Sequence, residues 1–201
     1  MKRKNGRLIV FEGIDKSGKS TQLIKLVGHL EARDKYQDVL RTHEPWKSKE
    51  IKKKLKEEKD AYSNAEEMAR LFVSDRIYHS EELILPNLEK GVFVLCDRYS
   101  MSTCAYQWAQ GVELDKLIKM HGDERILTPD LTIFVDISAD IAQERIVASG
   151  GSIEKFEYWD FLKRVADSYH HLIGRAYLEW ANREKPLFGH VVKINGGALL
   201  M

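Results

Sequence analysis

The chain has 201 residues, a length that fits one domain with a substantial buried core. Its 32 basic and 31 acidic side chains give a formal net charge of +1, which argues against a broad nucleic-acid surface, because such surfaces carry a basic excess. No apolar run approaches the roughly 18 residues of a membrane span, and the N-terminus lacks an apolar stretch of signal-peptide length. We therefore expect a cytoplasmic protein that binds neither nucleic acid nor membrane.

The first predicted elements are a strand, a glycine loop and a helix. Leu8–Phe11 is an apolar run typical of a buried parallel strand, and leucines and valines at helical spacing follow Lys19. Between them the sequence matches G-x-x-x-x-G-K-[ST], the phosphate-binding P-loop. Gly13 and Gly18 permit backbone conformations that a Cβ would block, so N–H groups can point at phosphate oxygens.

The P-loop predicts a site for ATP with Mg²⁺. Lys19 supplies a cation for the terminal phosphates, the Ser20 hydroxyl can ligate the metal, and the helix N-terminus favours an anion. The ATP-binding residues predicted in this loop are Gly13, Gly18, Lys19, Ser20 and Thr21.

A second strand is predicted at Val39–Thr42. The charged run Lys49–Lys59 mixes lysines with glutamates and is typical of a solvated helical face. A long helix is predicted to begin at Ser63, where Ser63 and Glu66 match a capping box, and to continue toward Gly91, with Pro86 kinking or interrupting it.

The third predicted strand, Val92–Cys96, ends at a carboxylate. Such an aspartate at the carboxyl edge of a parallel sheet, beside a P-loop, can hold Mg²⁺, and this predicts Asp97 as a metal residue with Arg98 next to it. Cys96 and Cys104 show no metal-ligand spacing and are expected to be reduced packing residues.

Strands at Leu131–Val135 and Val191–Ile194 complete a pattern in which strands alternate with helices. The predicted fold class is α/β: one three-layer P-loop NTPase domain, residues 1–201, with a five-stranded parallel sheet flanked by helices. The glycines near residues 149–157 predict a short lid over the phosphates.

Several spaced motifs, in this order, resemble the thymidylate kinase family over nearly the whole chain. They are FEGIDKSGKSTQ around the P-loop, LFVSDR at 71–76, CDRYSMSTCAYQ at 96–107, PDLTIFVDI at 129–137, and QERI with FLKRVADSYHHL near the C-terminus. The resemblance implies transfer of the γ-phosphate of ATP to dTMP, giving dTDP and ADP in dTTP biosynthesis, by a homodimer.

The resemblance also implies residue roles. Asp15 would bind the 3′-hydroxyl of the acceptor, Phe72 would stack on thymine, and Arg76 would contact the base edge. Arg98 would bind the acceptor phosphate, and Tyr106 would disfavour a 2′-hydroxyl. Thr103 and Gln107 complete the expected dTMP site, and Arg145 and Lys155 the ATP site. Phe72 and Arg76 are four residues apart, which independently places them on one helical face.

Two departures from the family pattern stand out. Bacterial relatives commonly carry Thr-Arg-Glu-Pro-Gly-Gly-Thr where this chain has Thr42-His43-Glu44-Pro45-Trp46-Lys47-Ser48. The lid lacks an arginine, so Lys16 in the P-loop is the first candidate for the transition-state cation and Lys155 the second. The expected catalytic residues are Lys16, Lys19, Asp97 and Arg98.

Two alternatives remain open from the sequence. A deoxynucleoside kinase would phosphorylate a 5′-hydroxyl with Glu44 as general base, although such enzymes lack the Asp15-type P-loop. A non-catalytic P-loop nucleotide sensor would keep the loop but lose the catalytic cations, whereas Lys19 and Arg98 are present here.

Overall fold

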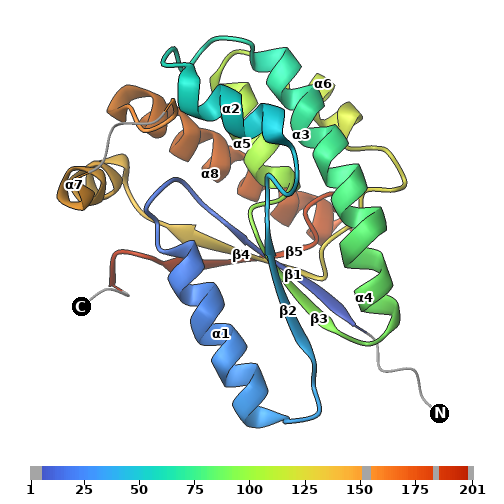
Figure 1. Ribbon diagram of the computed structural model, residues 1–201. Coiled ribbons are helices and arrows are strands. Elements are labelled where there is room, and N and C mark those ends of the chain that lie inside the picture. Colours follow the sequence, from blue (N-terminus) through green and yellow to red (C-terminus); the bar gives the residue numbers. More distant parts are fainter. Residues whose placement is uncertain (1–5, 151–154, 183–185, 199–201) are drawn as a thin grey trace.

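The computed structural model describes residues 6–150, 155–182 and 186–198. Its centre is a parallel five-stranded sheet in the order β2-β3-β1-β4-β5 (Figure 1). The strands are β1 (Arg7–Glu12), β2 (Val39–His43), β3 (Phe93–Asp97), β4 (Leu131–Asp136) and β5 (His190–Asn195). All five predicted strands are confirmed, and so is the α/β fold class.

Helices cover both faces of the sheet (Figure 1). They are α1 (Lys19–Arg33), α2 (Lys49–Glu57), α3 (Ala65–His79), α4 (Leu85–Glu89), α5 (Ser100–Ala109), α6 (Leu114–Met120), α7 (Ala139–Ser149) and α8 (Trp159–Ala181). Side chains alternate along β1, so Ile9 and Phe11 pack with Leu23 of α1, whereas Val10 packs on the opposite face with Ile77 of α3. The result is the predicted three-layer arrangement.

Each observed strand reaches one residue further toward its carboxyl end than the apolar pattern predicted. The final residues of the five strands are all polar: Glu12, His43, Asp97, Asp136 and Asn195. The apolar pattern ends at the last hydrophobic residue of each strand, but the strand pairing continues through the polar residue that follows it. Five polar residues therefore gather at the edge where open α/β sheets bind ligands.

The helix predicted from Ser63 begins two residues later. Asn64, with φ 55, is the N-cap of α3 and makes no side-chain cap. The Ser63 hydroxyl donates instead to Glu58 and to the carbonyl of Asp60, while Glu66 pairs with Arg70 and Lys116. The capping-box prediction is wrong, because the Ser63 hydroxyl is engaged in the turn that follows α2 and does not cap α3.

The interruption predicted near Pro86 is present. A π-helical turn, η1 (Ser80–Ile84), separates α3 from α4, and Pro86 lies in the first turn of α4. Proline has no N–H to donate, and a widened turn is one way that a helix accommodates it. The side chain of Asn87 donates to the carbonyl of Leu83, which satisfies one of the backbone groups at this junction.

The charged segment after β2 is helical and mostly exposed, as predicted, with Ile51 of α2 as its buried anchor. Of the predicted lid, residues 151–154 lie outside the described residues; α7 ends at Ser149, and Gly150 caps it with φ 68. In the part of the chain that the structure describes, no helix combines the length and apolar character needed to cross a bilayer.

Candidate active site

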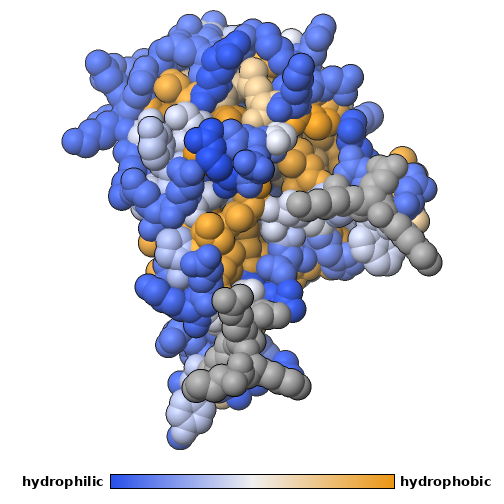
Figure 2. Space-filling model, turned by 90° about the vertical axis from the view of Figure 1, so that its right-hand side faces the viewer, coloured by the Kyte–Doolittle hydropathy of each residue, from blue (hydrophilic) through white to orange (hydrophobic). Residues whose placement is uncertain are grey.

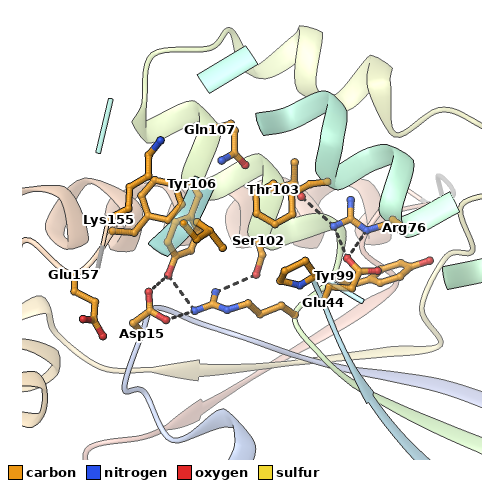
Figure 3. A pocket seen from close by; sticks show the side chains of 15 residues that line it. Asp15, Glu44, Arg76, Tyr99, Ser102, Thr103, Tyr106, Gln107, Lys155 and Glu157 are labelled. Atoms are coloured by element: carbon orange, nitrogen blue, oxygen red, sulfur yellow. Dashed lines mark hydrogen bonds and ion pairs between the residues drawn. The ribbon is translucent and has the colours of Figure 1, made fainter. Parts of the chain in front are cut away.

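Two adjoining cavities lie at the carboxyl edge of the sheet. The inner cavity, about 200 Å³, is bounded by α3, α5 and residues 155–157 (Figure 3). The P-loop cavity, about 830 Å³, lies over the loop between β1 and α1. Asp15, Glu44 and Arg98 line both cavities, so the two spaces meet at these side chains.

The loop between β1 and α1 has the backbone geometry of a phosphate cradle. Gly13 and Gly18 have φ values of 145 and 97, and Lys16 between them has φ 59. A Cβ on Gly13 would lie 2.6 Å from the carbonyl oxygen of Val135, so glycine is required there. Gly18 is the N-cap of α1, whose unpaired N–H groups and dipole favour an anion.

Lys19 is held inside this cradle with only 6% of its surface exposed. Its Nζ donates to the carbonyl oxygen of Ile14 at 2.8 Å and lies 3.5 Å from Ser17 Oγ. Burial, together with the positive charge of Arg98, lowers the pKa of Lys19 to about 8. A partly desolvated cation of this kind interacts strongly with a phosphate.

Ser20 and Asp97 form a pair of oxygen donors at one wall of the P-loop cavity. Ser20 Oγ donates to Asp97 Oδ2 at 2.6 Å. The second carboxylate oxygen, Oδ1, is buried and has no hydrogen-bond partner among the described residues. An unsatisfied buried acceptor next to a hydroxyl fits a small divalent cation, for which oxygen ligands are preferred.

Arg98 connects the two cavities. It adopts φ 68 directly after β3, and its guanidinium donates to Asp15 Oδ1 at 2.6 Å and to Tyr106 Oη at 3.1 Å. Tyr106 in turn donates to Asp15 Oδ2 at 2.9 Å. Burial opposes ionisation of Asp15, but the charges of Arg98 and Lys19 hold the pKa of this carboxyl below its usual value. Asp15 is therefore an anionic acceptor at neutral pH.

Glu12 has a role that the sequence did not indicate. It is fully buried, and its carboxylate accepts hydrogen bonds from the backbone N–H groups of Tyr99 (2.8 Å) and Ser102 (3.1 Å). These N–H groups belong to the first turn of α5, so a side chain from β1 caps this helix. The hydroxyl of Tyr169 donates to the same carboxylate at 2.9 Å. Burial raises the pKa of Glu12, and these hydrogen bonds oppose that rise.

Arg76 lies at the far wall of the inner cavity and is 1% exposed. Its Nε and NH2 donate to Glu44 Oε2 at 2.8 and 2.6 Å, and NH2 also donates to Thr103 Oγ1 at 2.9 Å. NH1 lies 2.7 Å from Nε2 of His121. Burial and the charge of Arg76 lower the pKa of His121 to about 3, so a neutral imidazole accepts this hydrogen bond.

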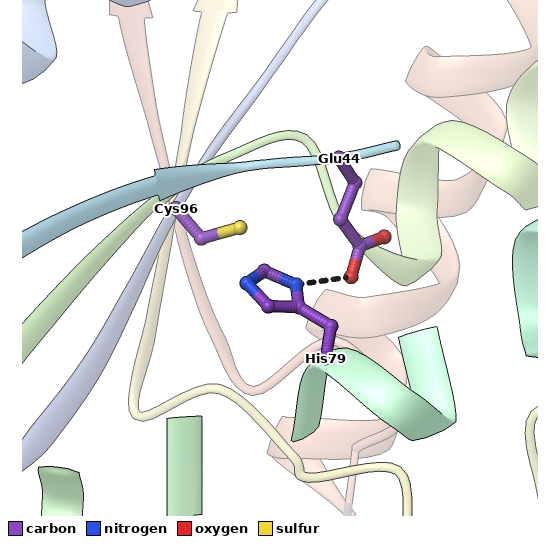
Figure 4. Close-up of side chains that lie close together, drawn as sticks. All are labelled: Glu44, His79 and Cys96. Carbon is purple, nitrogen blue, oxygen red and sulfur yellow. Dashed lines mark hydrogen bonds and ion pairs between the residues drawn. The ribbon is translucent and has the colours of Figure 1, made fainter. Parts of the chain in front are cut away.

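Glu44, His79 and Cys96 come close together behind this wall (Figure 4), with one ligand atom from each residue within 4.8 Å of the others. Glu44 is already bound by Arg76, and His79 Nε2 lies 2.7 Å from Thr42 Oγ1. Burial, with the nearby negative charge of Glu44, raises the pKa of the Cys96 thiol and disfavours the thiolate that binds metals. Cys96 is a free, buried packing residue, as predicted, and so is Cys104.

The remaining residues of the inner cavity come from α3 and α5. Phe72 lines it on the same face of α3 as Arg76, as their spacing predicted. Gln107 of α5 is buried, and its Nε2 donates to Gln110 at 3.0 Å, whereas its Oε1 has no hydrogen-bond partner in the described part of the chain. The cavity therefore combines an aromatic ring, an arginine and an unused amide oxygen, groups that suit a planar, polar ligand.

A family model described as thymidylate kinase matches residues 11–186. The chain belongs to the thymidylate kinase family. It is 36% identical to a probable thymidylate kinase of Staphylothermus marinus over 189 residues, which cover 92% of this chain and 91% of that protein. A thymidylate kinase of Desulfotalea psychrophila is 35% identical over 175 residues, with 86% and 84% covered, and a probable one of Archaeoglobus fulgidus is 39% identical over 158 residues, with 79% and 78% covered.

Arg145 and Lys155, the two cations expected at the ATP phosphates, lie in different cavities. Arg145 lines the P-loop cavity and donates to the carbonyls of Lys16 (2.9 Å) and Gly196 (3.2 Å). Lys155 lines the inner cavity instead, is fully buried, and pairs with Glu58 while donating to the Ser63 hydroxyl at 2.9 Å. Of the two candidates for the transition-state cation, Lys16 is therefore the one at the P-loop cavity.

The segment that departs from the thymidylate kinase pattern is fixed by Asp75 of α3. Its carboxylate accepts from the backbone N–H groups of Trp46, Lys47 (3.0 Å) and Ser48 (2.8 Å). The indole of Trp46 stacks on His79 with ring centroids 5.0 Å apart. In this chain, an aromatic contact and a carboxylate hold the segment that is glycine-rich in bacterial relatives.

Proposed function

We propose that the chain phosphorylates dTMP with ATP, and that it does so where the two cavities meet. ATP would occupy the P-loop cavity and dTMP the inner cavity. The observation that carries this assignment is Arg98, which lines both cavities and has Asp15 and Tyr106 as partners on the inner side. The proposal follows from the activity of the family to which the chain belongs.

In this reaction an oxygen of the dTMP phosphate forms a bond to the γ-phosphorus of ATP, the bond from that phosphorus to the β–γ bridging oxygen breaks, and dTDP and ADP result. The attacking phosphate is already largely ionised at neutral pH, since its second pKa is about 6, so no general base is needed. The chain supplies positive charge instead: Lys16 and Lys19 at the donor side, and Arg98 toward the acceptor phosphate.

We propose Mg²⁺ as the cation at Ser20 and Asp97, on the ground of the unsatisfied Oδ1 of Asp97. The ion would neutralise charge on the β- and γ-phosphates of ATP. Gly13, Gly18 and Thr21 would complete the donor site, with Arg145 supporting the backbone of Lys16.

The proposal gives several side chains of the inner cavity a role in binding the acceptor. Phe72 would stack on thymine, and Arg76, fixed by Glu44 and Thr103, would donate to the base edge. Asp15 would accept from the 3′-hydroxyl, and the Tyr106 ring would disfavour a 2′-hydroxyl. Further dTMP-binding positions in the proposal are Thr103 and Gln107. Lys155, paired with Glu58, would hold the wall of this cavity in place.

The deciding measurement is a substrate panel. We expect ADP formation that requires both dTMP and a divalent cation and is absent with thymidine, because the Glu44 carboxylate is held by Arg76 at Oε2 and lies 3.2 Å from His79 at Oε1. Activity on thymidine alone would favour a deoxynucleoside kinase. Nucleotide binding without acceptor-dependent turnover would favour a sensor.

We also propose that the enzyme is a homodimer of the cytoplasm. Figure 2 shows a band of hydrophobic side chains on the face that is on the right in Figure 1, and Tyr78 of α3 and Leu85 of α4 are 58% and 41% exposed. The two free buried cysteines suit a reducing compartment. Light scattering after size-exclusion chromatography should give twice the chain mass of 23.3 kDa; a monomer at all concentrations would contradict the dimer.

A further inference from the structure

Two basic side chains project from the carboxyl end of β2 into the P-loop cavity. Arg41 and His43 are separated by one residue in the strand, so they share a face of the sheet. Val39, two residues earlier, packs with the α1 cluster, which identifies this face as the α1 side. Both Arg41 and His43 line the P-loop cavity together with Lys19 and Ser20.

Arg41 differs from the other arginines of this cavity in its contacts. Arg98 donates to Asp15, and Arg145 donates to two backbone carbonyls. Arg41 is exposed, and its side chain makes no hydrogen bond or ion pair within the ranges 6–150, 155–182 and 186–198. A guanidinium carries five N–H donors in a planar fork that matches phosphate, and all five remain available to a ligand here.

The sheet register places His43 beside the proposed metal site, with Arg41 two residues back along β2, opposite Leu95. His43 pairs with Asp97 in the ladder, and β3 lies between β2 and the P-loop strand β1. Glu44, the next residue, lies where the two cavities meet. Arg41 and His43 therefore approach the Ser20–Asp97 pair from the side opposite the P-loop.

We propose that Arg41, with His43 beside it, forms a phosphate-binding subsite that contacts the phosphoryl group during its transfer. The inference rests on the proposed function and adds a cation to it. Lys16 and Lys19 approach the transferred group from the P-loop, and Arg41 approaches it from β2. Cations on two sides then stabilise the negative charge on the equatorial oxygens of the transferred group. This stabilisation lowers the barrier because it is strongest in the transition state.

The test compares Arg41→Gln with Arg33→Gln in steady-state assays with ATP, Mg²⁺ and dTMP. Arg33 is an exposed arginine in the last turn of α1 and serves as the matched control. We expect Arg41→Gln to lower kcat at least about tenfold, with the KM for dTMP within about twofold of wild type. The control should retain wild-type kinetics. Arg41→Lys should recover part of the rate, since it restores charge but not the fork.

Thermal unfolding separates this role from a structural one. Among the described residues the Arg41 side chain has no partner to lose, so the Tm of Arg41→Gln should equal that of wild type. A drop in Tm that accounts for the lost activity would overturn the proposal. Unchanged kcat would also overturn it, as would a loss confined to the KM for dTMP, which would place Arg41 at the acceptor. Wild-type turnover of dTMP in the same assay shows that the proposed function stands even if the subsite does not.

Discussion

Replacement of Lys19 by methionine is expected to lower kcat by about 10²–10³-fold, the effect of removing one preorganised donor at a developing charge. Lys19 is the cation buried within the cradle itself, at 2.8 Å from the Ile14 carbonyl. Lys25→Met, on an exposed turn of the same helix, is the matched control and should leave kcat unchanged. Equal kcat values for Lys19→Met and wild type would contradict the role given to this residue.

The same substitution should not weaken the fold. The pKa of Lys19 falls from 10.5 to about 8 on folding, because burial disfavours its charged form. A shift of this size corresponds to a destabilisation of up to about 3 kcal/mol that is fully present below about pH 8 and disappears as pH rises toward 10.5. Urea unfolding should therefore find Lys19→Met at least as stable as wild type near pH 7. The difference in free energy of unfolding between Lys19→Met and wild type should shrink toward pH 10. A difference that grew with pH would contradict the proposed effect of burying the Lys19 charge.

Replacement of Arg98 by alanine is expected to reduce kcat/KM for dTMP by about 10–150-fold, the value of a charge-assisted phosphate contact of about 1.5–3 kcal/mol. The KM for ATP should change much less, since the donor phosphates are held mainly by the P-loop. Arg98→Lys should retain part of the activity because it keeps the charge. If the kinetics with dTMP equalled those of wild type, Arg98 would not be the residue that binds the acceptor phosphate.

Arg98→Ala should also alter the pH profile. Burial raises the pKa of Asp15, and the charges of Arg98 and Lys19 bring it below its usual value. Without Arg98, Asp15 should protonate at a higher pH, so the acidic limb of kcat/KM for dTMP should move upward. Arg98→Lys should keep the limb close to that of wild type. An unmoved limb in the alanine variant would show that Arg98 does not control the charge of Asp15.

Features that depend on nearby residues, or on the general layout of a parallel sheet, could be predicted from the sequence. The strands and the P-loop follow from local hydropathy and motif spacing, and the place of Asp97 beside the P-loop follows from its position at the end of a strand. The shared cavity of Phe72 and Arg76 follows from helical periodicity. Each depends on neighbours in the chain or on the general rule that parallel strands end at one edge.

Features that join distant segments could not be predicted in this way. Lys155 and Glu58 are 97 residues apart, and only the folded chain shows that the lysine belongs to the wall of the inner cavity. The expected capping box failed because Ser63 is a partner in the same cluster. The partners of Glu12 on α5 are 87 and 90 residues away, so its role in capping that helix has no local signal in the sequence.

Glu12 links the two parts of the proposed active site. Its carboxylate joins the strand that carries the P-loop to the first turn of α5, the helix that carries Thr103, Tyr106 and Gln107. Phosphoryl transfer needs reacting atoms within about 3–3.5 Å of each other, and small misplacements are costly. Here the two walls of the proposed site are joined by a buried carboxylate, with hydrogen bonds of 2.8 and 3.1 Å, and by the contact of Tyr106 with Asp15 at 2.9 Å. The phosphate cradle and α5 are therefore connected through the buried interior as well as along the chain.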